Sequence, residues 1–143
     1  MKIVAELIDM EIVIRNIQPS DAGQWEALRR LLWPGDDEGH SVEIAAFFAG
    51  RLEEPQEVII AENKSGEMLA FAELSIRYDI PGLEQRRTGY VEGLYVDTRF
   101  RNQGLVRKLL QAARKWGTDQ RCMAFASDRA ERIIVDPTFR SAH

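Results

Sequence analysis

The chain has 143 residues, 19 basic against 23 acidic side chains, a formal net charge of −4, and 45% hydrophobic content. This composition is that of one ordinary globular domain over residues 1–143, neither disordered nor fibrous. A single cysteine, Cys122, excludes an internal disulfide framework and predicts a core residue, since its neighbours are mostly apolar. The absence of a span-length apolar stretch or signal-peptide pattern predicts a cytoplasmic protein with no membrane partner, and the acidic balance disfavours nucleic acid and mildly favours a cationic substrate.

The first third of the chain predicts a strand followed by two helices. Residues 10–15 alternate well enough to form a strand. Residues 19–33 open with helix-starting residues and then place Trp25 and three leucines at helical spacing. A loop rich in Pro, Gly and Asp interrupts this helix, and Ser41 is the expected cap of a second helix that ends before Pro55.

The remaining residues predict a strand–turn–strand unit, two further strands and a long amphipathic helix. The turn at 63–66 separates the first two strands, and Gly117 is expected to close the helix. The strands are predicted over residues 57–62, 68–77, 90–96 and 122–127, and the helix over residues 105–117. The order β-α-α-β-β-β-α-β is that of an α/β fold with a mixed sheet and a right-handed β-α-β crossover.

The segment from residue 90 to residue 117 carries the clearest chemical signal. A strand leads into a turn that contains Gly104, and the following helix presents unpaired backbone N–H groups at its N-terminus. The helix dipole adds positive charge there, as do Arg99, Arg101 and Arg107. A phosphate or pyrophosphate is therefore the natural ligand, and a solvated basic loop is the alternative that these residues leave open.

The sequence EGLYVDTRFRNQGLVRKLL resembles the acetyl-coenzyme-A-binding motif of the Gcn5-related N-acetyltransferase (GNAT) superfamily, Arg/Gln-x-x-Gly-x-Gly/Ala before a long helix. Arg101 and Gly104 fill the first and fourth positions, and Val106 departs from the small residue of the sixth. The resemblance implies a GNAT-like mixed sheet, acetyl-CoA as cosubstrate and no metal. It assigns cofactor binding to Leu94, Tyr95, Val96, Arg101, Asn102, Gln103, Gly104, Leu105 and Val106. Backbone N–H groups near the first two would stabilise the thioester oxygen as it gains charge.

Four short segments together resemble the aminoglycoside 6′-N-acetyltransferases, in order and spacing, over residues 11–128. They are LW followed by an acidic loop and a His, then AELSIRYD, GYVEGLYV and FASD. In that group the acetyl group passes directly to the 6′-amine of an aminoglycoside antibiotic, which gives resistance. The resemblance implies the same activity here. An acetyltransferase for another polycationic amine, and a weak or inactive remnant that binds ligand or only self-associates, stay open.

Direct acyl transfer requires the attacking amine to lose a proton, and carboxylates are the candidates for that role and for holding a polyamine. Glu73 and Glu92 occupy strand positions where apolar residues are expected, and Asp128 ends a strand near the place where parallel strands open into a cleft. With the resemblance, these three are the catalytic candidates. The alternatives are exposed glutamates paired with Arg77 or Arg87, and a capping role for the aspartate.

The loop between the first two helices matches the LW…H pattern, so the resemblance makes it one wall of the substrate site. A tryptophan would stack on a sugar ring there, and acidic side chains would attract ammonium groups. The expected substrate-binding residues are Trp33, Asp36, Asp37, His40, Tyr78 and Asp79. A solvated acidic loop is the alternative.

The resemblance stops after Asp128, and residues 129–143 form a divergent tail. Relatives continue there with a helix and further strands, so the C-terminal part of the fold is expected to be incomplete, as after a truncation. The segment RIIVD, residues 132–136, can form a short strand. An apolar face and an unpaired sheet edge would remain, which predicts a homodimer that covers them. A tail that folds back on its own subunit is the alternative.

Overall fold

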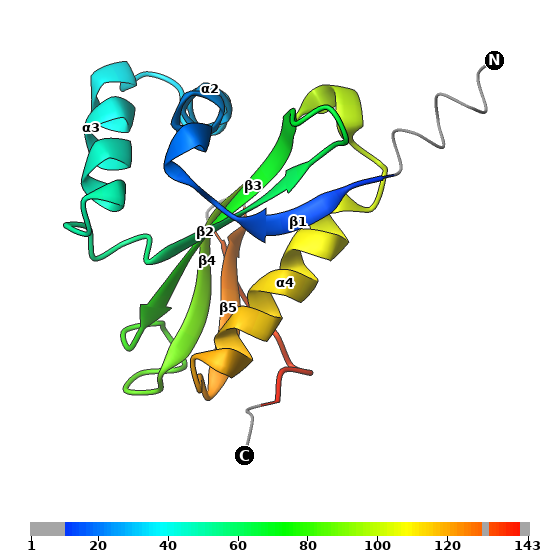
Figure 1. Ribbon diagram of the computed structural model, residues 1–143. Helices are drawn as coiled ribbons and strands as arrows, with labels where there is room; N and C mark the ends of the chain where they lie inside the picture. The colour runs from blue at the N-terminus through cyan, green and yellow to red at the C-terminus, as the bar shows by residue number, and fades with distance from the viewer. Residues whose placement is uncertain (1–10, 130–131, 141–143) are drawn as a thin grey trace.

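The computed structural model describes residues 11–129 and 132–140. Its six strands form one sheet in the order β1-β2-β3-β4-β5-β6 (Figure 1). Neighbouring strands are antiparallel, except that β4 and β5 are parallel. The strands are β1 (Val13–Asn16), β2 (Glu57–Glu62), β3 (Met68–Arg77), β4 (Thr88–Val96), β5 (Ala124–Arg129) and β6 (Arg132–Val135).

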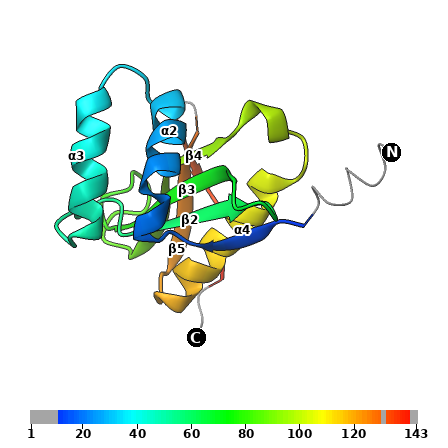
Figure 2. The ribbon, with the colours of Figure 1, turned by 45° about the horizontal axis from the view of Figure 1, so that its top comes forward.

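Helices cover both faces of the sheet (Figure 2). On one face lies α4 (Leu105–Asp119), which buries Leu105, Leu109 and Ala113 at four-residue spacing against the sheet. The other face carries the aromatic cluster of Trp25, Phe47 and Phe48 under α2 and α3. The remaining bounds are η1 (Pro19–Asp21), α2 (Ala22–Leu32), α3 (Asp37–Phe48) and η2 (Thr98–Phe100).

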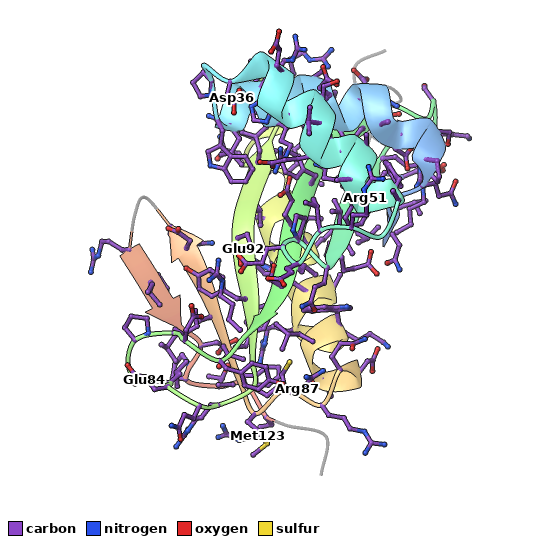
Figure 3. The ribbon with its side chains drawn as sticks, turned by 90° about the vertical axis from the view of Figure 1, so that its left-hand side faces the viewer. Asp36, Arg51, Glu84, Arg87, Glu92 and Met123 are labelled. Atoms are coloured by element: carbon purple, nitrogen blue, oxygen red, sulfur yellow. The ribbon has the colours of Figure 1, made fainter. Side chains whose placement is uncertain are left out.

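Two local features of β4 open a site at the middle of the sheet. Glu73 pairs with Gly93 while the next residue of β3 pairs with Val91, so Glu92 is the extra residue of a β-bulge. In addition, β4 pairs with β5 only from Thr88 to Val91. Beyond that point the second half of β4 has no paired strand on its β5 side among the described residues, and β5 leans away from it (Figure 3).

The predicted α/β fold and element order are confirmed, with differences at the ends of helices and of β1, β4 and β5. The second helix begins at Asp37, ahead of Ser41, because the Asp36 carboxylate accepts a hydrogen bond from the Gly39 amide and caps it. The last helix runs past Gly117 to residue 119. A Cβ at Gly117 would lie 3.3 Å from the Phe125 ring, so this glycine allows helix and sheet to approach closely.

The tail continues the sheet beyond residue 127, where the sequence predicted its end. The predicted strand in RIIVD is confirmed as β6, which pairs with β5 in the same chain. Phe139 then returns to the core and stacks on Phe125, with ring centroids 5.6 Å apart. Ile133, Ile134 and Val135 nevertheless remain about two-fifths exposed, at 40%, 43% and 42%. The tail therefore closes part of its own core and leaves β6 uncovered in the described chain.

Cys122 is buried in the main core cluster, as predicted. Burial raises the pKa of its thiol, because a thiolate is poorly solvated there. Such a thiol is a packing residue and not a reactive nucleophile.

Candidate active site

A first cleft of about 630 Å³ lies at the N-terminal end of α4. Leu31 and Leu32 from the end of α2 form its far wall. All the predicted cofactor-binding residues except Gln103 line it, namely Leu94, Tyr95, Val96, Arg101, Asn102, Gly104, Leu105 and Val106. The tertiary structure thus brings the end of β4 and the turn before α4 to one cavity, which we name the cofactor cleft.

The turn before α4 has the features of an anion site. Gly104 has a φ of +76°, a conformation that favours glycine, and a Cβ there would meet no atom within 4 Å. The amide of Lys108 donates to the Gly104 carbonyl, so the amides of residues 105–107 precede the helical hydrogen-bond ladder. Arg101 donates from Nε to the Val96 carbonyl at 3.1 Å at the end of β4, and it lines the same cleft as the first turn of α4. The backbone N–H groups and this charge can hold a pyrophosphate.

A second cleft of about 700 Å³ opens between β4, β5 and the residue that follows α2. Trp33, Glu92 and Asp128, all predicted from the sequence, line it together. The remaining lining residues are Leu32, Val91, Gly93, Leu94, Val106, Leu110, Ser127 and Arg129. We name this second cavity the acceptor cleft. It meets the cofactor cleft, because both are lined by Leu32, Leu94 and Val106.

Glu92 is held in the acceptor cleft by Arg77. Arg77 donates from Nε and Nη2 to the two carboxylate oxygens, at 2.6 and 3.0 Å. These hydrogen bonds raise the pKa of Arg77 above its usual range, so its guanidinium stays charged. Figure 3 shows Glu92 on the sheet face between the α2–α3 pair and the loop after β3. Glu92 therefore pairs with Arg77, as one alternative from the sequence had it, and it also lines the acceptor cleft.

Asp128 differs from Glu92, because its carboxylate forms no hydrogen bond or ion pair with any residue that the structure describes. It is exposed at the end of the β4–β5 pairing. Burial raises the pKa of the nearby Tyr90, and the negative charges of Asp128 and Glu92 raise it further. The sequence did not single out Tyr90, although its position two residues before Glu92 places it on the same sheet face.

Trp33 reaches the acceptor cleft because β4 carries a glycine opposite it. A Cβ at Gly93 would lie 2.4 Å from Cη2 of the Trp33 ring, too close for any side chain. Trp33 itself is 37% exposed, and Leu32 beside it contacts the same glycine. The sequence missed Leu32 as a lining residue, and its adjacency to Trp33 was the available signal.

Glu73 and His40 lie behind the wall of the acceptor cleft and line neither cavity. Glu73 is 1% exposed, and its carboxylate accepts hydrogen bonds from Arg29 Nε at 2.7 Å and Trp25 Nε1 at 3.0 Å. Its partner is therefore Arg29, and neither Arg77 nor Arg87. His40 is also buried, with its ring between Arg29 and the Trp33 carbonyl.

Of the other predicted substrate-binding residues, Asp36, Tyr78 and Asp79 do not line either cleft. Asp36 is exposed and caps α3. Tyr78 is exposed and its hydroxyl accepts a hydrogen bond from Arg87 at 2.7 Å, while Asp79 is exposed 3.5 Å from Arg77. Asp37 begins α3, and its side chain is outside what the structure describes.

Residues 11–129 and 132–140 contain no group of three or more His, Cys, Asp or Glu that could hold a metal ion. Within the same ranges, no helix is long and apolar enough to cross a membrane.

Comparison with known proteins agrees with this geometry. Residues 25–134 match the acetyltransferase (GNAT) family model. The chain is 37% identical over 137 residues to aminoglycoside N(6')-acetyltransferase type 1 of Klebsiella aerogenes, covering 95% of this chain and 88% of that protein. It superposes with a TM-score of 0.74 and 30% identity on AAC(6')-Iy in complex with a bisubstrate analog, CoA-S-monomethyl-acetylneamine, over 84% and 80% of the two chains. AAC(6')-Ih from Acinetobacter baumannii gives a TM-score of 0.73 with 29% identity, over 83% and 80%. This chain belongs to the GNAT family of acetyltransferases.

Proposed function

We propose that this protein transfers an acetyl group from acetyl-CoA to the 6′-amine of an aminoglycoside, an activity that gives resistance to these antibiotics. The observation that carries the proposal is the meeting of two clefts along Leu32, Leu94 and Val106. One cleft ends on an anion-binding helix terminus, and the other presents two carboxylates. The names of the similar proteins support the same substrate class.

The residues of the cofactor cleft fit coenzyme A. Open space beyond Gly104 gives a pyrophosphate access to the backbone N–H groups of the first turn of α4. The apolar side chains of Leu94, Leu105 and Val106 suit the uncharged arm of the molecule. When bound, acetyl-CoA supplies an activated acetyl group as a thioester. Val106 lines the cleft without closing it, although the family motif has a smaller residue there.

The acceptor cleft can bind and deprotonate an ammonium group. Glu92, fixed by Arg77, holds a cationic substrate in one orientation. Asp128, with no protein partner among the described residues, is the better candidate to take the proton from the attacking amine. The free edge of β4 beyond Val91 leaves backbone N–H groups near Leu94 and Tyr95 to stabilise charge on the acetyl oxygen. The amine nitrogen bonds to the acetyl carbon, the carbon–sulfur bond breaks, and the proton that Asp128 takes from the nitrogen is passed on to the sulfur, so that coenzyme A leaves as a thiol.

The activity is tested by following coenzyme A release with three acceptors: a kanamycin-type aminoglycoside, a polyamine and a peptide. We expect turnover with the aminoglycoside, and mass spectrometry should find one acetyl group on the 6′-amine. Preferential acetylation of the polyamine or peptide would replace this proposal with an acetyltransferase for another amine. Binding of coenzyme A without turnover of any acceptor would identify an inactive member of the family.

We also propose that the protein forms the homodimer predicted from its sequence. Its support is the outer edge of β6, where three β-branched residues are exposed on a strand that could pair with its copy. Light scattering at micromolar concentration should give twice the chain mass, and Ile134→Lys should return the mass of one chain. A parent protein that stays monomeric would refute the dimer. The predicted cytoplasmic location is tested by cell fractionation.

A further inference from the structure

Behind the acceptor cleft lies a buried charged cluster that the proposed chemistry does not use. Arg29 of α2 donates from Nε and Nη2 to the carboxylate of Glu73, at 2.7 and 3.3 Å. Nη2 also lies 2.6 Å from a carboxylate oxygen of Glu43 on α3, whose side chain is half exposed, so the buried charges are those of Arg29 and Glu73. Desolvating these charges is costly, and an apolar cluster of the same size would stabilise the core as well or better. Stability alone is therefore a poor reason for this cluster.

His40 extends the cluster toward the cleft. Its Nδ1 lies 3.1 Å from Nη1 of Arg29, and a guanidinium can only donate, so Nδ1 accepts. The proton of the neutral ring is then on Nε2, which donates to the Trp33 carbonyl at 2.7 Å. Arg29 thus selects the tautomer of His40 that can hold the backbone of Trp33.

Trp33 is held by this cluster on several sides. The guanidinium carbon of Arg29 lies 5.2 Å from its ring centre. The Trp33 amide donates to the Arg29 carbonyl at 2.9 Å, a backbone hydrogen bond that ends α2 and does not depend on the Arg29 side chain. The ring also lies against Gly93 of β4. The contacts run from a carboxylate buried in the sheet to an aromatic ring in the cleft wall.

We propose that Arg29, held by Glu73 and His40, is a positioning residue that sets Trp33 in the acceptor cleft and so determines how tightly the acceptor binds. Glu73 and His40 act through Arg29 and Trp33 without touching the substrate. The effect on the acceptor rests on the proposed function, whereas the placement of the Trp33 ring does not.

The chain contains a matched control. Arg15 of β1 also donates to two carboxylates, those of Asp21 and Glu62, at 2.8 to 3.0 Å. This cluster lines neither cleft. Arg29→Lys and Arg15→Lys both replace a planar multidentate donor with a single ammonium, so both lose comparable contacts. Only Arg29→Lys removes a contact with the Trp33 ring.

Kinetics and fluorescence provide independent measurements. We expect Arg29→Lys and His40→Ala to raise the KM for a kanamycin-type aminoglycoside about 10-fold, that is about 1.4 kcal/mol. The kcat and the Kd for coenzyme A should stay within about twofold of the parent, because the cofactor cleft is built mainly on β4 and α4. His40→Gln should recover much of the loss, since an amide can also accept from Arg29 and donate to Trp33. Arg15→Lys should leave all three constants unchanged.

Iodide quenching of tryptophan fluorescence reports the ring itself. His40→Ala should make tryptophan more accessible to iodide, and this increase should vanish when Trp33→Phe is added. The positioning role is overturned if Trp33 accessibility stays at the parent value in His40→Ala, if the acceptor KM does, or if Arg15→Lys has equal effects. Should Arg29→Lys fail to fold, the two His40 variants carry the test. If the parent acetylates no aminoglycoside but His40→Ala still exposes Trp33, the proposed function fails and the positioning of Trp33 stands.

Discussion

Among single residues, the two carboxylates of the acceptor cleft differ in their surroundings. Glu92 shares its charge with Arg77 through two hydrogen bonds, whereas Asp128 has no such partner in the described ranges. Substitution by the isosteric amide should therefore affect the two positions differently. The amide at position 92 removes a negative charge that holds the cationic substrate, and the amide at position 128 removes a proton acceptor.

We expect Asp128→Asn to lower kcat/KM for the aminoglycoside at least about 10-fold, about 1.4 kcal/mol, mainly through kcat. Glu92→Gln should raise KM by a similar factor, because the acceptor cleft loses a negative charge that attracts a polycation, while Arg77 keeps its ion pairs with Glu54 and Asp79. Steady-state kinetics measures both, with Glu84→Gln in the exposed loop after β3 as control (Figure 3). Parent-like constants for both cleft variants would remove these carboxylates from the site.

At the scale of elements, α4 supplies the anion site through its first turn and the residue before it. Gly104 is the N-cap, with positive φ and open space beside it. A negative side chain at this position would itself interact with the positive end of the helix dipole, repel a phosphate and occupy its space.

Gly104→Asp should weaken coenzyme A binding at least about 10-fold by calorimetry. Gly104→Asn is the control, since asparagine has the same size, adopts positive φ readily and carries no charge. It should bind more tightly than the aspartate variant. Unchanged affinity in Gly104→Asp would show that coenzyme A does not bind at this turn.

The edge strand β1 is attached to its neighbours by the Arg15 cluster. Hydrogen bonds from Arg15 hold the pKa of Asp21 below its ordinary 3.8 and that of Glu62 below its ordinary 4.5. Because both carboxyls bind protons less readily in the folded state, their stabilisation is complete above these ordinary values. It is lost as the pH falls through the lowered pKa values of the folded protein.

The free energy of unfolding of the parent should therefore fall steeply below about pH 4.5, and less steeply in Arg15→Met. At neutral pH the variant should be less stable than the parent. Urea titrations at a series of pH values measure both slopes. The exposed pair of Lys115 and Asp119 gives a comparison, in which Lys115→Met should retain the parental slope. Parallel curves for Arg15→Met and the parent would refute a role of this cluster in acid stability.

For the whole molecule, the tail decides how completely the core is closed. Phe139 is buried against Phe125 and lies 3.6 Å from the position of a Cβ on Gly117, so it joins the tail to both β5 and α4. The chain also covers 88% of the Klebsiella aerogenes relative, and the matched family region extends to residue 134 within β6.

Phe139→Ala should lower the free energy of unfolding by about 3 kcal/mol, because it removes a buried aromatic side chain and leaves a cavity. Ile134→Ala, at a site 43% exposed, should cost much less. Urea denaturation followed by circular dichroism compares the two. An equal, small loss in both variants would mean that the tail adds little to the core.

The sequence by itself determined the order of helices and strands, because hydrophobic periodicity and turn residues act over a few neighbouring positions. It also singled out residues that line one cavity, since that cavity is built largely from one continuous segment of strand, turn and helix. Helix ends were less predictable: Asp36 capped α3 in place of Ser41, and packing against Phe125 let α4 continue through Gly117.

Only the tertiary structure decided which polar residues meet. In the sequence, Glu73 and Glu92 were both carboxylates in predicted strands, with nothing to distinguish them. In the fold, Glu73 pairs with Arg29, 44 positions away, and Glu92 pairs with Arg77. No local pattern records such distant partners. The β4 bulge and the divergence of β5 likewise open the acceptor cleft beside Glu92 while α2 seals Glu73 inside. A residue's type set what chemistry was available, and its place in the packed sheet set whether a ligand could reach it.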